Sequence, residues 1–361
     1  MQILCLCRED NLTNTLAEYA REFREQNVDL VCVRMGTPFD ANITELLKLC
    51  SEEPLAIFHP ESDFPLFPFG LTETLIPTLC FQVDAYAYTE HRYKWSCLFD
   101  NVGVFHPGFA KNFKERGHAG AFLNPHAVRK TLYTPSPEEK MFEIGWVGQS
   151  QGPIYRRRES LLPQLAKTFQ MNDWKRTYKL DELASVYRRS RIVVNIGRDD
   201  YPQDANLRTL EAMAGGALLI TSLPTELIDL GFIEGQDFIG YNEETDVVPL
   251  AKRYLNDESS RARIAEAGKD KVLRHHTYQE RVANLIAGLK KTKSRFAAPA
   301  RKWPKAKVDL AYMDYYAANG ALPEAAKVLP KLMFRNPIKG VEGSIQLLRA
   351  LARKTIAKLR G

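Results

Sequence analysis

The stretch that decides the fold runs from Arg191 to Thr221 and reads RIVVNIGRDDYPQDANLRTLEAMAGGALLIT. Its apolar runs IVV and ALLI lack polar alternation, which is typical of strands buried on both faces of a parallel sheet. Between them, Asp204 or Asn206 can cap a helix whose apolar residues recur at helical spacing, and Gly215-Gly216 ends it. This pattern predicts a βαβ-like unit whose ligands bind beyond the carboxyl ends of its strands.

The sequence predicts two series of alternating strands and helices. The first precedes this stretch, and the second contains it. Six apolar runs of strand length, separated by polar and helix-like intervals, lie at 3–7, 30–33, 55–58, 79–83, 102–105 and 121–123. After the Pro-rich segment 134–137, further strands are expected at 142–147 and 237–241. The chain is therefore predicted to hold two α/β units, 1–137 and 138–289, followed by a basic linker and helical tail, 290–361.

Length and composition are those of a globular chain of about two domains, with 361 residues, 45% of them hydrophobic and 26% charged. No apolar run reaches the roughly 18 residues that a membrane span needs, and the N-terminal MQILCLCRED does not resemble a signal peptide. We therefore expect a cytoplasmic protein. All six cysteines fall in the first hundred residues without metal-ligand spacing, which favours buried free thiols over a metal site.

The net charge of +6 is unevenly distributed along the chain. From Lys290 onward, seventeen Lys or Arg face four Asp or Glu, a balance of +13, so residues 1–289 sum to −7. The last predicted helix, 344–359, carries an apolar stripe beside its cations: Ile345, Leu348, Ala352, Ile356 and Leu359. Such a helix either lies on an anionic bilayer or packs on the rest of the protein. No aromatic-basic module accompanies it, so we expect no nucleic-acid partner.

A glycine-bearing turn between the strand 142–147 and the next helix contains Gly148 and Gln149. Three arginines, Arg156, Arg157 and Arg158, open the helix that follows. Cations in the first turns of a helix oppose its dipole, so a bound polyanion would explain them; a solvated basic face is the alternative. The turn matches neither G-x-G-x-x-G nor a P-loop.

Polar residues stand where three strands of the first series end, namely His59, Asp84 and His106. In a doubly wound sheet these ends share one rim, so the three side chains are candidates for a common cleft. Each is also a residue that turns and caps commonly contain, particularly beside Pro60 and Pro107.

Three motifs, in order over residues 143–287, resemble the donor-binding domain of GT-B glycosyltransferases, and most of all the CgeB-like (spore-maturation-protein B) branch. They are GWVG at 145–148 with the arginines 156–158, NLRTLEA at 206–212, and HTYQER at 276–281. The resemblance implies an α/β protein of GT-B fold, with two Rossmann-like domains facing a cleft and a C-terminal helical appendage. Residues 1–137 would bind the acceptor and 138–289 the nucleotide sugar.

The resemblance also implies roles for individual residues. Glu211 would bind the ribose hydroxyls of the donor, since a carboxylate accepts from two vicinal hydroxyls. The donor site would further include Gly148, Gln149, Arg156, Arg157, Arg158, Asn206, Arg208 and Thr209. Because arginine stabilises a departing nucleotide diphosphate, we expect no metal and no cofactor other than the donor, a UDP-sugar. The chain has no D-x-D motif, and only Asp199-Asp200 supports a Mg²⁺-dependent alternative.

One position departs from the resemblance. Retaining GT-B enzymes of the large family 4 often carry E-x₇-E, but Gln203 stands eight residues before Glu211, with Asp204 next to it. The stereochemistry therefore stays open. An inverting enzyme would need a base to deprotonate the acceptor hydroxyl, for which Asp84 and His59 are the candidates.

The sequence thus predicts a metal-independent glycosyltransferase of the hexosyltransferase type. It would transfer sugar to a glycan, lipid-linked or protein acceptor in bacterial surface-glycan or protein glycosylation, with peripheral contact at the inner face of the membrane through the basic tail. Two alternatives remain open: a GT-B-fold nucleotide-sugar 2-epimerase, and a non-catalytic surface or spore-coat assembly protein.

Overall fold

The computed structural model describes residues 1–12, 14–61, 66–134, 138–291 and 296–360, and divides the chain into two compact units. The first unit comprises 1–105, 109–124 and 284–361, and the second comprises 106–108 and 125–283. The chain thus enters the second unit at 125, earlier than the segment 134–137 at which the sequence places the boundary; residues 135–137 lie outside the described part. The tail 290–361 belongs to the first unit.

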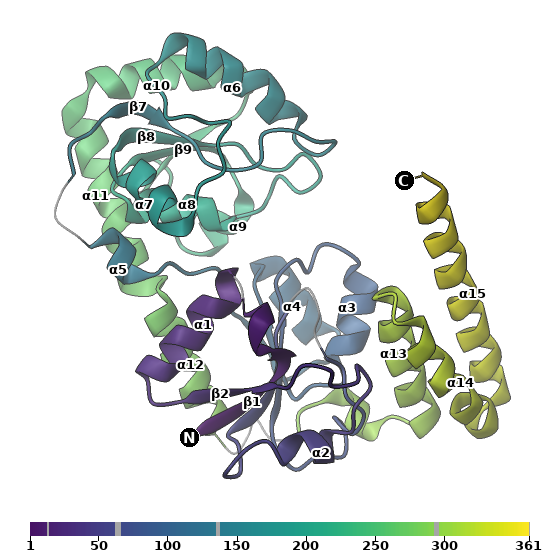
Figure 1. The fold of residues 1–361 in the computed structure, drawn as a ribbon. Coiled ribbons are helices and arrows are strands. Elements are labelled where there is room, and N and C mark those ends of the chain that lie inside the picture. The colour runs from purple at the N-terminus through teal and green to yellow at the C-terminus, as the bar shows by residue number, and fades with distance from the viewer. Residues whose placement is uncertain (13, 62–65, 135–137, 292–295, 361) are drawn as a thin grey trace. The chain divides into compact units, whose positions relative to one another are not determined.

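The first unit is built on a six-stranded sheet with the order β2-β1-β3-β4-β5-β6 (Figure 1). The strands are β1 (Gln2–Arg8), β2 (Asp29–Val33), β3 (Ala56–His59), β4 (Thr78–Gln82), β5 (Asn101–Val104) and β6 (Ala121–Leu123). All neighbouring strands pair in parallel. Every residue of β3, β4 and β5 is buried, which explains why these strands read as unbroken apolar runs in the sequence.

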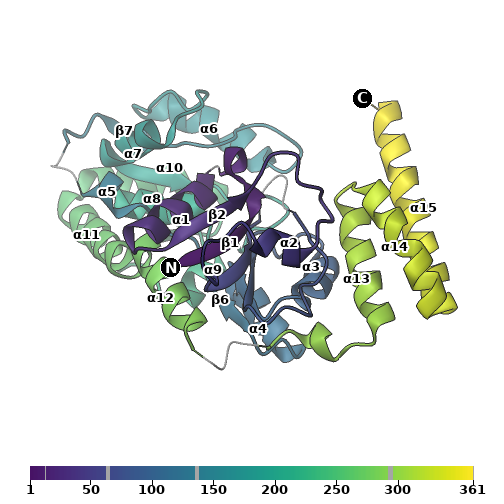
Figure 2. The ribbon, with the colours of Figure 1, turned by 60° about the horizontal axis from the view of Figure 1, so that its bottom comes forward.

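Helices α1 (Asn14–Glu25), α2 (Ile43–Leu47), α3 (Thr89–Ser96) and α4 (Pro107–Glu115) follow strands of this sheet. The tail adds α13 (Lys305–Ala318), α14 (Leu322–Arg335) and α15 (Pro337–Arg360) at one end of the unit (Figures 1 and 2). Helix α13 lies beside α3, and α14 and α15 pack on α13 and on each other. Helix α13 is buried along most of its length and contributes Leu310, Met313 and Tyr316 to the core of the sheet unit. The tail is therefore part of that core.

A buried ion pair fixes the segment that leads into the tail. Asp100 has no exposed surface, and its carboxylate accepts two hydrogen bonds of 2.8 Å from the Arg301 guanidinium. It also accepts from the amide and hydroxyl of Thr78, both at 3.0 Å, and from the Ala298 amide at 3.1 Å. One carboxylate thus ties β4 to the chain just before α13.

The second unit has a four-stranded parallel sheet with the order β10-β9-β8-β7. Its strands are β7 (Phe142–Gly145), β8 (Ser190–Asn195), β9 (Leu218–Ser222) and β10 (Ile239–Tyr241). Its helices are α5 (Lys130–Tyr133), α6 (Arg156–Thr168), α7 (Leu180–Arg188), α8 (Leu207–Ala214), α9 (Thr225–Asp229), α10 (Val247–Asn256), α11 (Glu258–His275) and α12 (Tyr278–Leu289), the last of which runs back into the first unit. Successive β8 residues enter cores on opposite faces, Val193 on one and Ile192 and Val194 on the other. The predicted βαβ unit at 191–221 is confirmed as β8-α8-β9.

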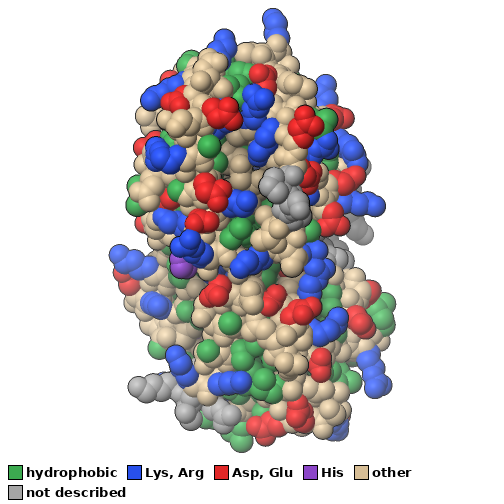
Figure 3. Space-filling model, turned by 90° about the vertical axis from the view of Figure 1, so that its left-hand side faces the viewer, with side chains coloured by type: hydrophobic (Ala, Val, Ile, Leu, Met, Phe, Trp, Pro, Cys, Tyr) green, Lys and Arg blue, Asp and Glu red, His purple; other side chains and the backbone are tan. Residues whose placement is uncertain are grey.

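All six cysteines lie in the first unit. All six cysteines are free thiols, and four of them, Cys5, Cys7, Cys80 and Cys97, are buried. No helix in the described ranges combines the length and the apolar character that crossing a membrane requires. On the face displayed in Figure 3, basic and acidic side chains are interspersed.

Removing the cation of the buried pair should destabilise the first unit. Arg301→Ala leaves the Asp100 carboxylate buried and uncompensated, so we expect a loss of about 3 kcal/mol in the free energy of unfolding, measured by urea denaturation. Lys302→Ala, a change at the exposed neighbouring residue, is the matched control. Equal stability of the two variants would contradict this account of how the tail is held.

Candidate functional site

The glycine turn after β7 brings two helices and a buried tryptophan together. The Asn172 side chain pairs with both backbone groups of Trp146 at 2.9 Å, which holds the chain extended past the end of β7. Gly148 then adopts a φ of +154°. A Cβ at this position would lie 3.0 Å from Nε of Arg208 and 3.4 Å from the Trp146 ring. Glycine is therefore required for the Arg208 guanidinium to approach the turn so closely.

The three arginines that open α6 have different surroundings. Arg158 is 1% exposed, and its guanidinium donates to the carbonyls of Ile196 and Gln149 at 2.9 and 2.8 Å. Arg157 is paired with Asp199 at 2.8 Å. The Arg156 side chain is exposed, and only its backbone amide is bonded, to the same Asp199 carboxylate. Of the three, Arg158 is the one that the fold holds inside the turn.

The neighbouring pair Asp199-Asp200 serves the loop after β8. Asp199 caps the start of α6 and pairs with Arg157, while Asp200 accepts two hydrogen bonds from Arg198 at 2.9 and 2.8 Å. The two carboxylates are therefore engaged with Arg157 of α6 and Arg198 of the loop, an arrangement that positions backbone rather than a free pair of metal ligands.

The positively charged groups of Arg158 and Arg208 lie near enough to influence each other. Burial, followed by the nearby charge of Arg208, lowers the pKa of Arg158 to about 10, so the guanidinium still carries its proton at neutral pH. Within the described ranges, no acidic side chain forms an ion pair with Arg208. Two guanidinium groups held together without a carboxylate between them make a local field that favours a polyanion.

The start of α8 is fixed by two residues of the predicted site. The Asn206 side chain caps the helix by accepting from the Arg208 amide at 3.1 Å, and the Thr209 hydroxyl donates to the Asn206 carbonyl at 2.7 Å. These bonds engage the side-chain oxygen of Asn206 and the hydroxyl of Thr209 within the chain itself. Asn206 and Thr209 are thus placed to orient the helix that carries Arg208 and Glu211.

Glu211 lies one helical turn beyond Arg208 and is 4% exposed. Among the described residues, none donates a hydrogen bond to its carboxylate. Burial raises the pKa of Glu211 from its usual value of 4.5 to about 8, while the charge of Arg208 acts in the opposite direction. A buried acceptor of this kind is costly to the free protein and well suited to a ligand that brings its own hydroxyl donors.

A second network, centred on Glu226 at the start of α9, was not anticipated from the sequence. Its carboxylate lies 2.9 Å from Nδ1 of His106 and accepts from the Tyr201 hydroxyl at 2.7 Å and the Ala205 amide at 3.2 Å. Among the described side chains, His106, Asp204 and Glu226 form the one group close enough to hold a metal ion. Because the Glu226 oxygens already serve these hydrogen bonds, the network supports the loop before α8.

The two candidate bases of the first unit differ sharply in exposure. His59 is 6% exposed, its Nε2 lies 3.1 Å from the Tyr315 hydroxyl, and the Phe67 and Phe99 rings pack against it. Burial lowers the pKa of His59 to about 3, so the imidazole is neutral. This position, inside an aromatic core formed with the tail, disfavours contact with a substrate. Asp84 follows β4 and is exposed.

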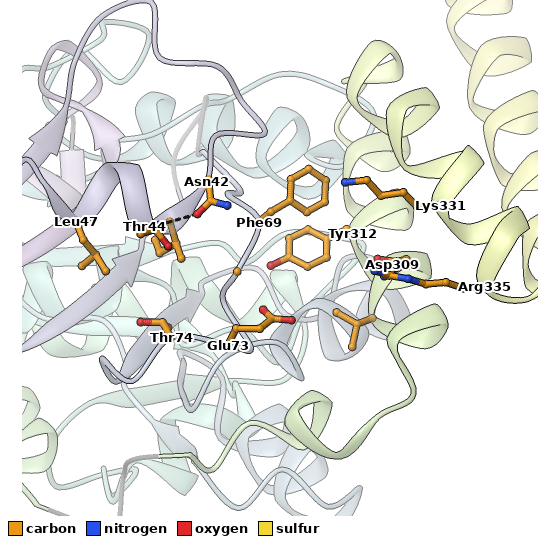
Figure 4. A pocket seen from close by; sticks show the side chains of 13 residues that line it. Asn42, Thr44, Leu47, Phe69, Glu73, Thr74, Asp309, Tyr312, Lys331 and Arg335 are labelled. Carbon is orange, nitrogen blue, oxygen red and sulfur yellow. Dashed lines mark hydrogen bonds and ion pairs between the residues drawn. The ribbon is translucent and has the colours of Figure 1, made fainter.

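The first unit also contains a cavity of about 370 Å³ between the loops around Asn42 and Phe69 and helices α13 and α14. Figure 4 shows the Phe69 and Tyr312 rings side by side, with Lys331 and Arg335 reaching toward them from α14. The lining contains two acids, Glu73 and Asp309, and two cations, with Arg335 paired to Asp309. The cavity therefore has no excess charge with which to select an ion.

Comparison with known proteins places the second unit in context. Residues 156–287 match a family model described as Glycosyl transferase-like. The fold is similar to that of HepE from Anabaena, solved in complex with UDP-glucose, with 12% sequence identity, a TM-score of 0.56, and coverage of 80% of this chain and 100% of that one. Sucrose-phosphate synthase from Thermosynechococcus elongatus is similar at 11% identity and a TM-score of 0.51, covering 79% and 97% of the two chains. A search of curated proteins by sequence finds no match.

These matches confirm the predicted fold class, since both solved structures are GT-B glycosyltransferases and the alignments extend over four fifths of the chain. The chain carries a glycosyl-transferase-like domain, and the matched segment contains Arg208 and Glu211. The matched model is not specific to the CgeB-like branch, so that finer assignment stays a prediction.

Replacing the buried acid should change how stability depends on pH. Between pH 4.5 and about 8 the folded chain retains the Glu211 proton and the unfolded chain loses it, so this residue lowers the free energy of unfolding increasingly as the pH rises. In Glu211→Gln that loss is absent. We expect the stability difference between variant and wild type, from urea denaturation, to move in the variant's favour from pH 5 to pH 8. Glu266→Gln, at an exposed position of α11, is the control; parallel pH profiles for all three proteins would refute the assignment.

Proposed function

We propose that this chain is a glycosyltransferase that moves a sugar from a nucleotide-diphosphate sugar to an acceptor hydroxyl. The observation that carries the proposal is the combination, around one glycine turn, of the guanidinium groups of Arg158 and Arg208 with the buried carboxyl group of Glu211, to which no described residue donates a hydrogen bond. A nucleoside diphosphate supplies the two things this site lacks, negative charge and a pair of vicinal hydroxyl donors. A UDP-sugar is the donor we propose, and the HepE complex with UDP-glucose supports it.

In the mechanism that we propose, Glu211 accepts hydrogen bonds from the ribose and Arg208, with Arg158 behind it, stabilises the diphosphate as it departs. The backbone of Gly148 and Gln149 would lie against the phosphates, because Gly148 has no side chain to exclude them. Arg156 would contribute its positive charge at the exposed edge of the same site. Arg157 positions the loop after β8 by pairing with Asp199. Charge neutralisation by arginine makes the proposed reaction independent of a metal ion.

Asp84 is our candidate for the base that deprotonates the acceptor hydroxyl if the reaction inverts configuration, because its carboxylate is exposed. We keep His59 only as a residue that supports the surrounding core. The acceptor that we propose is a glycan, lipid-linked or protein hydroxyl in bacterial surface-glycan or protein glycosylation, with transfer of a hexose. The reaction would take place in the cytoplasm at the inner face of the membrane.

The donor site can be tested by nucleotide binding. Arg208→Ala and Glu211→Ala each remove a hydrogen-bonding partner of the ligand, so we expect the dissociation constant for UDP to rise at least about tenfold, measured by calorimetry or thermal shift. Arg156→Ala removes a guanidinium from the same helix start at an exposed position, and we expect a smaller change. Absence of UDP, GDP and dTDP binding by the wild type would overturn the proposal.

The base can be tested separately from the donor site. Asp84→Asn should lower kcat by about 10²-fold or more, since general-base catalysis contributes that much, while the affinity for the donor stays unchanged. The measurement is release of nucleotide and of glycosylated product with an acceptor extract. Full turnover in Asp84→Asn would remove this residue from the mechanism. Conversion of the donor sugar without any acceptor would instead identify an epimerase.

A further inference from the structure

The outward side of α15 carries a row of exposed apolar side chains. Ile338, Val341, Ile345 and Leu348 are exposed by 81%, 55%, 44% and 65% and recur at intervals of three and four residues, so they lie along one side of the helix. We call these four residues the outer stripe. The side chains of 354–360, which include the predicted stripe residues Ile356 and Leu359, lie outside the described part.

The opposite side of α15 is fixed against the other tail helices. Gly340 lies against Met333 of α14, and Gly343 against Met313 of α13, so closely that a Cβ at either glycine would collide with the methionine sulfur. Leu347 packs on the same core. Helix α15 runs along the outside of α14 (Figure 1). Rotation of the helix would break these glycine contacts, so the outer stripe cannot turn inward.

The apolar surface continues onto the end of α14. Phe334 is 93% exposed, and it lies four residues before Ile338, immediately ahead of the turn into α15. Single exposed apolar residues are ordinary on protein surfaces, but five such side chains within fifteen residues are typical of an interaction surface.

Charge identifies the kind of partner. Helix α15 contains six Lys or Arg and one acid, Glu342, which is already paired with Lys339 at 2.6 Å. At 100° per residue, Arg349 and Arg353 lie next to the outer stripe on one flank, and both are exposed. A second copy of this surface would bring cation against cation. An anionic, apolar-faced partner matches both features.

We infer that the outer stripe, with Phe334, binds the surface of an anionic phospholipid bilayer, with α15 lying in the plane of the interface. The apolar side chains would enter the boundary between headgroups and acyl chains, and Arg349 and Arg353 would contact the lipid phosphates. The functional value of this membrane contact depends on the proposed function, since a transferase held at the membrane can reach acceptors attached to lipid.

Vesicle co-sedimentation of the full chain tests the inference. We expect binding to vesicles of phosphatidylcholine with one quarter phosphatidylglycerol, little binding to phosphatidylcholine alone, and weaker binding in 0.5 M salt. Ile338→Ser/Leu348→Ser should weaken binding at least about tenfold, because each change removes the free energy that the apolar side chain gains on moving from water into the bilayer. Arg349→Glu/Arg353→Glu should abolish the preference for anionic vesicles.

Matched variants exclude general effects. Leu75→Ser alters an equally exposed apolar residue elsewhere in the first unit, and Lys252→Glu/Arg263→Glu reverses two exposed cations of α10 and α11; both should bind like the wild type. Equal binding to neutral vesicles, no binding to anionic ones, or a dimer that Ile338→Ser/Leu348→Ser dissociates would each overturn the inference. UDP binding measured on the same samples separates the two proposals, because loss of vesicle binding with UDP binding retained contradicts only the membrane contact.

Discussion

The proposed donor site depends on holding two like charges beside an acid to which no described residue donates a hydrogen bond, in a place from which water is largely excluded. Arg158 sits in the turn because two backbone carbonyls fix it, and Arg208 reaches the same place because Gly148 has no side chain. Glu211 is buried beside them without a donor among the described residues. Each of these placements costs free energy in the empty protein, and a ligand of opposite charge and polarity would recover it. The capping bonds of Asn206 and Thr209 maintain the arrangement at the start of α8.

Much of the fold could be predicted because its strands are buried on both faces. The unbroken apolar run 192–194 directly predicts a buried strand. The Gly-Gly pair that ends α8 indicates that a new element, the next strand, follows. The Gly148 turn and the capped start of α8 are likewise local features. They could be read without knowing which other residues lie nearby.

What the sequence did not reveal depends on long-range packing. Nothing near His59 indicates that Tyr315, 256 positions later, would enclose it in the core, nor that Arg301 would neutralise Asp100. The three arginines 156–158 look equivalent in the sequence, but Arg157 pairs with Asp199 from another loop and Arg158 donates to the distant carbonyls of Ile196 and Gln149. The network around Glu226 could not be predicted from local sequence, because its partners, His106 and Tyr201, come from separate segments. A carboxylate soon after a strand end, as Glu226 is after β9, was the available signal.

The chain path through the two units has a consequence for how the protein is made. Residues 125–283 form one uninterrupted unit, whereas the first unit needs α13, which begins at Lys305, to complete its core. During synthesis the ribosome therefore releases the whole second unit before it releases the last core helix of the unit whose synthesis started first. We expect the core of the N-terminal sheet to stay partly exposed to solvent until the tail has been synthesised. The two units would then finish folding in the reverse of the order in which their synthesis begins.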